Sequence, residues 1–266
     1  MDRNVLGLSE LESTIHWWDY PKKKLLVTRG LDVPTSTTVS TKVYNNQSGT
    51  PLLTGDLPDT LTTLVFDFGF DQAVSPYVLP ASLQSIVFNN PFNQPILEDV
   101  LPSSLTTLVF GYSFNQPIAP RTLPASLRTL VFGIQFNQPL MAKDVLPPSL
   151  SSLSLERNYL HPFNPMSRPS IRSLTLINLI HIDHPGLAMS SVTSLTLGDD
   201  AFNVAIAPGS LPPSLKTLVL GHFFDHEIEP LTLPAGLTSI DFSTRFNKSL
   251  DNIPNSIECQ YWIDQT

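Results

Sequence analysis

The chain has 266 residues, a formal net charge of −8, 41% hydrophobic residues and only 14% charged residues. This acidic balance argues against a nucleic-acid ligand, which needs clustered Lys and Arg; the basic residues are scattered apart from Lys22-Lys23-Lys24. One cysteine excludes an intramolecular disulfide framework, and no apolar run reaches the roughly 18 residues of a membrane-spanning helix.

Residues 1–56 do not repeat cleanly, and we interpret them as an N-terminal cap with degenerate strands. Residues 5–18 are predicted to form a short helix that ends before Pro21, and residues 25–28 and 39–44 read as strands. Trp17 and Trp18 belong to the core of this cap or, alternatively, to a partner-binding or dimerisation patch. The first residues lack the pattern of a secretory signal, so a cytoplasmic location is expected.

Residues 57–250 contain nine units of about 22 residues. Each unit begins with a block such as LPSSLTTLVF, which starts at Leu101. Within it, apolar residues alternate in the pattern L-x-x-L-x-F/L, as at Leu105, Leu108 and Phe110, which predicts a strand of about four residues. The copies near residues 167 and 188 lack the Leu-Pro pair, so coil shape is expected to vary over residues 165–200.

A second block, such as FNQPI from Phe114, follows each first block. Its Phe is predicted to stack on its counterparts, and its Pro excludes a helix from this part of the coil. The residue after Phe is Asn or Asp, which we interpret as a ladder that satisfies backbone groups at the bend. The ladder consists of Asp71, Asn93, Asn115, Asn137, Asn164, Asp183, Asn203, Asp225 and Asn247.

These features predict a mainly β fold, a leucine-rich-repeat solenoid. It should be an arc-shaped right-handed coil with a parallel sheet on the concave face, turns and extended segments on the convex face, and little helix. Residues 251–266 are predicted to be the C-terminal cap, in which Ile257, Tyr261 and Trp262 close the last coil.

The FNQPI and FNQPL blocks, each preceded by LPxSLxxLVFG-like segments, resemble the FNIP-repeat family, a class of leucine-rich-repeat proteins. The resemblance covers about residues 55–250. It implies a protein-interaction module of the kind found in social amoebae and in giant viruses of protists. The chain departs from family members that carry a kinase domain, because it has no kinase motif.

The strand residues that point outward form columns of Ser/Thr and of Val, Ser or Thr. One reading is β-propensity and stacking between coils. The other is a concave binding face, with mildly apolar character at its N-terminal half. The candidate binding residues are Val65, Asp67, Val87, Asn89, Val109, Val131, Glu156, Thr175, Thr196, Val219 and Asp241.

No catalytic or phosphate-binding motif occurs, and unit spacing is too constant for an inserted active-site loop. His181, His184, His222 and His226 lie beside acidic residues but lack the closing pattern of a metal site. We therefore expect no catalytic residue, metal or cofactor. The predicted function is a non-enzymatic scaffold for an unidentified protein partner. The alternatives are a self-assembling protein that forms homo-oligomers through its ends or N-terminal cap, and a carbohydrate-active enzyme.

Overall fold

The computed structural model divides into two compact units, Met1–Thr37 and Thr38–Thr266. It describes residues 41–44, 51–140, 142–161, 165, 170–177, 185–198, 203–221, 223–242 and 245–257, all of them in the second unit. The predicted helix at 5–18, the strand at 25–28, Trp17, Trp18, Tyr261 and Trp262 lie outside the described residues.

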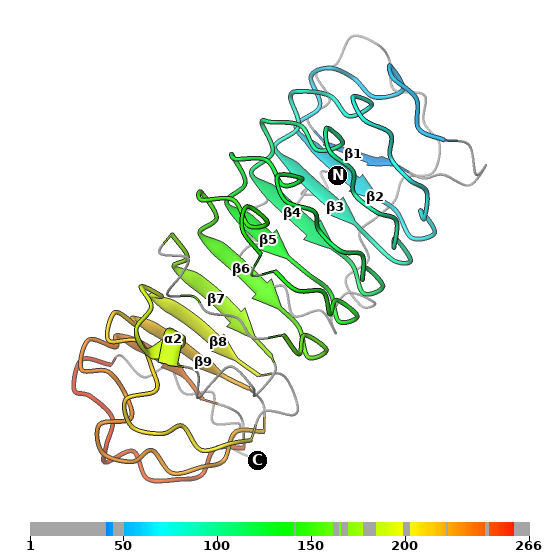
Figure 1. Ribbon diagram of the computed structural model, residues 1–266. Coiled ribbons are helices and arrows are strands. Elements are labelled where there is room, and N and C mark those ends of the chain that lie inside the picture. The colour runs from blue at the N-terminus through cyan, green and yellow to red at the C-terminus, as the bar shows by residue number, and fades with distance from the viewer. Residues whose placement is uncertain are drawn as a thin grey trace, which may run out of the picture. The chain divides into compact units, whose positions relative to one another are not determined.

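The second unit is built around one parallel sheet of ten strands that follow one another in chain order (Figure 1). Each of the nine predicted first blocks contains one strand, and the predicted strand at 39–44 contains the first strand of the sheet. The strands are β1 (Thr41–Tyr44), β2 (Thr63–Phe66), β3 (Ser85–Phe88), β4 (Thr107–Phe110), β5 (Thr129–Val131), β6 (Ser152–Leu155), β7 (Ser173–Leu176), β8 (Ser194–Leu197), β9 (Thr217–Leu220) and β10 (Ser239–Asp241).

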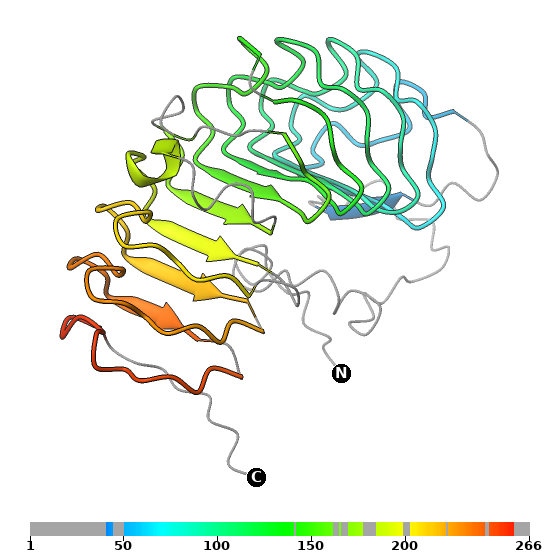
Figure 2. The same ribbon diagram turned by 60° about the horizontal axis from the view of Figure 1, so that its bottom comes forward.

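Each strand pairs with the next without a register shift between equivalent residues. Thr63 pairs with Ser85, Ser85 with Thr107 and Thr107 with Thr129. Sheet neighbours lie about 4.8 Å apart, so identical side chains of successive coils lie in direct contact. Figure 2 shows the strands along the inner side of the curved stack, which places the sheet on its concave side as predicted.

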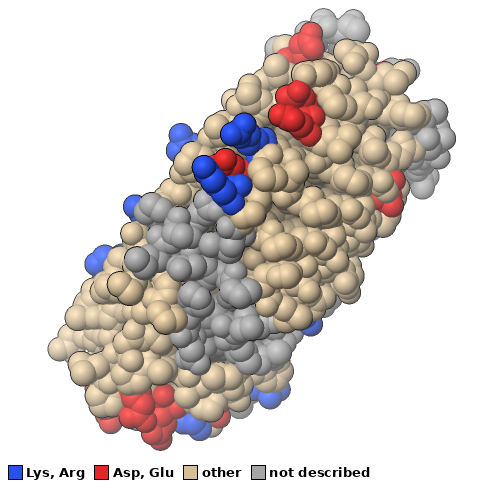
Figure 3. Space-filling model, viewed as in Figure 1, with Lys and Arg blue, Asp and Glu red and all other residues tan. Residues whose placement is uncertain are grey.

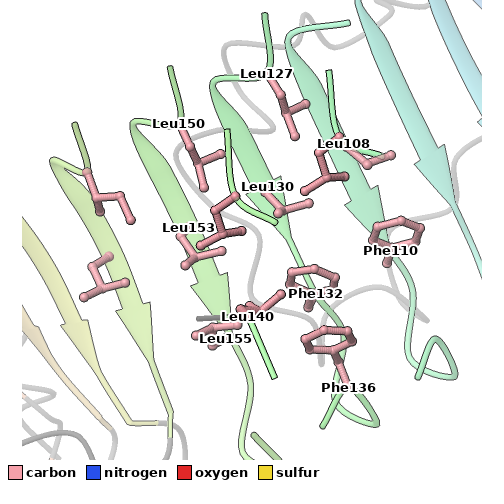
Figure 4. Close-up of a cluster of buried hydrophobic side chains, with 14 of the residues drawn as sticks. Leu108, Phe110, Leu127, Leu130, Phe132, Phe136, Leu140, Leu150, Leu153 and Leu155 are labelled. Carbon is pink, nitrogen blue, oxygen red and sulfur yellow. The ribbon is translucent and has the colours of Figure 1, made fainter. Parts of the chain in front are cut away.

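The core lies between the sheet and the turns, and Figure 4 shows part of it. Leu105, Leu108 and Phe110 are fully buried, and so are their counterparts in neighbouring coils. Alternate strand residues enter this core because side chains on a strand point to opposite sides. Each fully buried side chain contributes about 1.5–3 kcal/mol before entropy is subtracted.

Two stacked columns of aromatic rings run through the N-terminal half of this core. Phe88 and Phe110 belong to the strand column, with ring centroids 5.6 Å apart. Phe92 and Phe114 belong to the column at the bend, 6.0 Å apart. The two columns also stack on each other, since the rings of Phe110 and Phe114 lie 3.8 Å apart. The bend rings thus stack coil on coil as predicted, and the strand rings form another stack beside them.

The fifth ring of the bend column differs from the predicted one. The pattern assigns Phe163 to this position, but Tyr159 is the residue that stacks on Phe136, at 6.1 Å and an interplanar angle of 2°. Tyr159 is fully buried. Phe163 lies outside the described residues. The bend motif is degenerate in this unit, and the buried aromatic nearest to the strand fills the stack.

Turns occupy the rest of each coil, and the single helix among the described residues is α2 (Pro185–Ala188). Before each Leu-Pro pair the chain makes a tight corner at which φ is positive. Non-glycine residues occupy it at Tyr77, Asp99, Arg121, Asp144 and Leu231. None of the helices in the described part of the chain is long and apolar enough to cross a membrane.

Candidate binding face

The concave face, defined as the sheet surface that points away from the core, carries the predicted outward columns. Thr41 extends the Ser/Thr column by one member, because it pairs with Thr63. The full column in sheet order is Thr41, Thr63, Ser85, Thr107, Thr129, Ser152, Ser173, Ser194, Thr217 and Ser239. It is an uninterrupted row of hydroxyl side chains across the whole sheet, in which Thr63 and Ser85 are buried and the other members are half-buried or exposed.

The second outward column changes character halfway along the sheet. Val65, Val87, Val109 and Val131 are direct neighbours and, like Val43 on β1, make this half apolar. Ser154, Thr175 and Thr196 follow on β6 to β8, and Val219 and then an exposed Asp241 end the column. The structure thus brings eight of the predicted binding residues into one line.

The other three predicted residues, Asp67, Asn89 and Glu156, lie where the strands end. The Asp67 carboxylate accepts the N–H of Phe68 at 2.7 Å. Asn89 and Glu156 each expose only 7% of their surface. Glycines occupy the same position at Gly111 and Gly133, where a Cβ atom would lie 2.9 Å and 2.2 Å from backbone atoms of the preceding coil. Close packing leaves little of this column for a partner to touch.

A ladder of Asn and Asp side chains runs along the bends that follow the strands. The Asn93 Oδ1 atom accepts the backbone N–H of Asn115 at 2.8 Å, and Asn115 accepts that of Asn137 at 2.8 Å. Asp71 begins this series by accepting the N–H of Asn93 at 2.8 Å. The side chains therefore replace the backbone partners that the bend removes.

The ladder changes in the middle of the array and then resumes. Asn137 accepts the N–H of Leu160 at 2.9 Å, so Leu160 occupies the position that the sequence pattern assigns to Asn164. Asn164 and Asp183 lie outside the described residues. In the last coils, Asn203 accepts the N–H of Asp225 at 3.0 Å, and Asp225 accepts that of Asn247 at 3.3 Å.

In several coils the residue after the ladder position supplies a second donor, which sequence reasoning missed. Gln94 donates to the Asp71 carboxylate at 3.0 Å, and Gln116 donates to Asn93 at 3.3 Å. Imidazole rings take this position at His161 and His226, each 3.1 Å from a ladder-residue carbonyl oxygen. The available signal was the polar residue that directly follows the Asn or Asp in most units, with Pro165 and Val204 as exceptions.

The other predicted histidines, His181, His184 and His222, lie outside the described residues. Within the described ranges, no three His, Cys, Asp or Glu side chains converge as metal ligands would. The two histidines that can be placed belong to the ladder.

A serine ladder on the other side of the coil was also missed. The Ser104 hydroxyl donates to the carbonyl of Leu83 at 2.6 Å, and Ser126 donates to Leu105 at 2.6 Å. The same bond recurs at Ser82, Ser149, Ser214 and Ser256. This serine is the fourth residue of the LPxSL block, so its constancy reports a coil-to-coil hydrogen bond.

Perturbed pKa values occur in the core and at the corners and do not mark a catalytic centre. Burial raises the pKa of Tyr159 to about 12. At a corner, a hydrogen bond to Asp99 raises the pKa of Tyr77. Burial, followed by the charge of Asp56, raises that of Tyr44. In Figure 3 the described residues on the side facing the viewer are mostly uncharged, with a few separate groups of charged side chains.

Comparison with known proteins identifies the repeats. The FNIP Repeat family matches residues 46–91, 92–135, 114–158, 136–179, 190–223 and 224–259. The crystal structure of CroV588, a giant-virus protein described as a novel circular LRR protein structure, is similar with a TM-score of 0.66 and 36% sequence identity. The alignment covers 78% of this chain and 31% of CroV588. No curated protein matches the chain. Because the family matches span most of the sequence, the chain belongs to the FNIP-repeat family of leucine-rich-repeat proteins.

Proposed function

We propose that the chain is a non-enzymatic scaffold that binds a partner protein through its concave face and the adjacent turns, in the cytoplasm or, if it is viral, in the host cytoplasm. The observation that carries this proposal is the continuous outward surface of ten in-register strands. On this surface Val65, Val87 and Val131 present partly exposed apolar side chains, with the buried Val109 between them, beside a row of hydroxyls. Contiguous apolar surface of this kind commonly marks an interaction site.

The regularity of the coils supports a binding role over catalysis. Successive ladder bonds join residues 22 positions apart through the N-terminal coils. Neighbouring strands keep their register even where the coil length changes. A catalytic centre needs several different groups that converge on one point, whereas the Ser/Thr column here repeats one kind of side chain along the whole sheet.

The test is capture of a partner by the full chain with two matched double variants. V87E/V131E places two carboxylates on the concave face. L53E/L97E places two at exposed positions in the turns. Both variants are first checked for wild-type circular dichroism. We expect saturable capture of a protein from a eukaryotic cell lysate by the wild type and by L53E/L97E, and its loss in V87E/V131E.

Capture that does not saturate, or that both variants retain equally, contradicts the proposal.

Self-assembly is a second candidate, favoured by the apolar side chains at both ends of the described stack. Tyr44 at one end and Phe242, Phe246, Ile253 and Ile257 at the other are only partly buried against the core. The edges of a sheet are also its natural sites of further pairing. Light scattering tests this candidate: a mass that rises with concentration supports assembly, and a monomer mass throughout contradicts it.

A further inference from the structure

One row of residues lies directly before the strands, where the coil enters the sheet. Its members stack coil on coil through the backbone. The N–H groups of Arg128 and Thr129 both donate to the carbonyl of Thr106, at 2.8 Å and 3.0 Å. The same pair of bonds recurs at every coil along the row Thr62, Gln84, Thr106, Arg128, Ser151, Arg172, Thr193, Lys216 and Thr238.

Long and short side chains alternate strictly along this row. Gln84, Arg128, Arg172 and Lys216 are long and exposed. Thr or Ser lies between each pair, and its hydroxyl donates back to the preceding long residue's carbonyl, as from Thr106 to Gln84 at 3.0 Å and from Thr238 to Lys216 at 3.0 Å. The row therefore repeats every two coils, although the core repeats every coil.

Three of the four long residues are cations, which we call the basic row: Arg128, Arg172 and Lys216. They precede β5, β7 and β9, whose arrow tails can be followed in Figure 1. Because two strand spacings separate successive members, the cations lie about 9.6 Å apart and span about 19 Å. From β3 to β10 the segments between the coil start and the strand carry no Asp or Glu.

Core packing does not explain the cations, because these side chains are exposed. Stacking alone does not explain them either, since Gln84 satisfies the same position without a charge. The Lys216 ammonium donates to the carbonyl of Gly236 at 2.9 Å, and an ammonium has three N–H donors, so this bond does not use all of them. On a chain with a net charge of −8, three cations in a line create a local positive edge beside the Ser/Thr column. Such an edge attracts carboxylates, and the neighbouring hydroxyls can donate to the same oxygens.

We propose that the basic row binds an acidic segment of a partner protein that runs along the concave face, across the strands. This inference rests on the proposed function and specifies the chemistry of the partner. An α-helix rises 1.5 Å per residue, so carboxylates about seven residues apart would meet successive cations.

The test uses the full chain and a fluorescent 20-residue polyglutamate peptide, with binding followed by fluorescence anisotropy. R128Q/K216Q removes two cations of the basic row. R121Q/K143Q removes two cations from exposed positions in the turns and is the matched control, because the net charge changes equally. We expect R128Q/K216Q to weaken binding about tenfold or more and R121Q/K143Q to change it less than about twofold. Binding should also weaken as salt is raised.

Absence of polyglutamate binding, or an equal loss in both variants, overturns the proposal. Tighter binding of a single-stranded oligothymidylate with equal charge also overturns it, because the row would then favour a nucleic acid. If polyglutamate fails while V87E/V131E still abolishes partner capture, the basic row is wrong and the proposed function stands. If polyglutamate fails to bind and capture of a partner protein from the lysate also fails to saturate, the basic row and the proposed function are both wrong.

Discussion

The coils of β2 to β5 and those of β6 to β9 use the same strands but different means of holding their bends. In the first group, strands β2, β3 and β4 each end with a Phe. Two columns of rings stack there, and the Asn ladder is continuous. In the second group, Leu155, Leu176, Leu197 and Leu220 end the strands. At the start of this group the backbone N–H of Leu160 takes the place of a ladder Asn as the donor to Asn137, and a short helix, α2, lies in the turns.

The difference shows that strand register and bend structure are separable. Ser152 pairs with Ser173 and Ser194 with Thr217, although their separations of 21 and 23 residues differ from those of the first coils. The sheet therefore tolerates changes in bend length as long as the inward Leu column and the backbone ladder continue. We expect the repeated Phe-Asn bend, with its stacked rings and ladder bonds, to make the first group the more stable one.

The largest effect should come from the ring stack. Phe114→Ala removes a fully buried ring that stacks on Phe92, Phe110 and Phe136, and we expect a loss of about 4 kcal/mol in the free energy of unfolding. Leu176→Ala, in the second group, should lose about 3 kcal/mol. Urea denaturation measures both. An equal or larger loss at Leu176 would remove the special role of the rings.

A glycine of the first group should be nearly as sensitive. Gly133→Ala places a Cβ atom 2.2 Å from the carbonyl oxygen of Gly111, which is backbone and cannot turn aside. We expect a loss of about 3 kcal/mol. Gly236→Ala is the control, because its Cβ would approach only the movable end of Lys216. Thermal unfolding compares the two, and similar melting temperatures would refute the close approach.

The ladder should contribute less than the rings. Asn115→Ala leaves the N–H of Asn137 without its acceptor and removes a partner of Gln138, which should cost about 1–3 kcal/mol. Asn115→Asp keeps the acceptor, as Asp71 and Asp225 do naturally, and should cost less. If both substitutions have the same effect in urea denaturation, the Oδ1 acceptor is not what the position requires.

Alkaline pH should unfold the protein partly through Tyr159, at the junction of the two groups. Its folded pKa of about 12 lies above the ordinary value of 10.0. The protonated form is therefore favoured by folding, and this contribution is complete below pH 10 and is lost as pH rises toward 12. Tyr159→Phe should show a shallower fall in the free energy of unfolding over that interval. Parallel pH profiles for the two proteins would contradict the raised pKa.

The smallest effect concerns a corner in the second half of the array. Leu231 has φ of 66° and is 87% exposed, so its side chain strains the backbone without packing. Leu231→Asn should raise the free energy of unfolding by about 0.5 kcal/mol, since Asn tolerates this conformation. Tyr77→Asn is the comparison and should not stabilise, because it removes the hydrogen bond to Asp99. Calorimetry can resolve the sign.

Much of this architecture follows from the sequence because each inward position repeats with a fixed spacing. The columns of Leu108 and Phe114, the outward hydroxyls and the first ladder bonds could all be predicted that way. Degenerate motifs misled the prediction at Tyr159, where an aromatic four residues before Phe163 completes the stack.

Features with another period were harder to predict. The basic row repeats every second coil, so its cations look scattered until the backbone bonds align Arg128 with Thr106 and Ser151. The near burial of Asn89 and Glu156 depends on the path of the preceding coil. The residues around Asn89 and Glu156 in the sequence do not reveal how the preceding coil runs past them.

Hydrogen–deuterium exchange along the native chain tests most directly whether the ring stack and continuous ladder make the first group of coils the more stable one. Backbone amides of β3 and β4 should exchange more slowly than those of β7 and β8, because opening them breaks both the stack and the ladder. Equal protection across the sheet, or slower exchange in β7 and β8, would contradict this account.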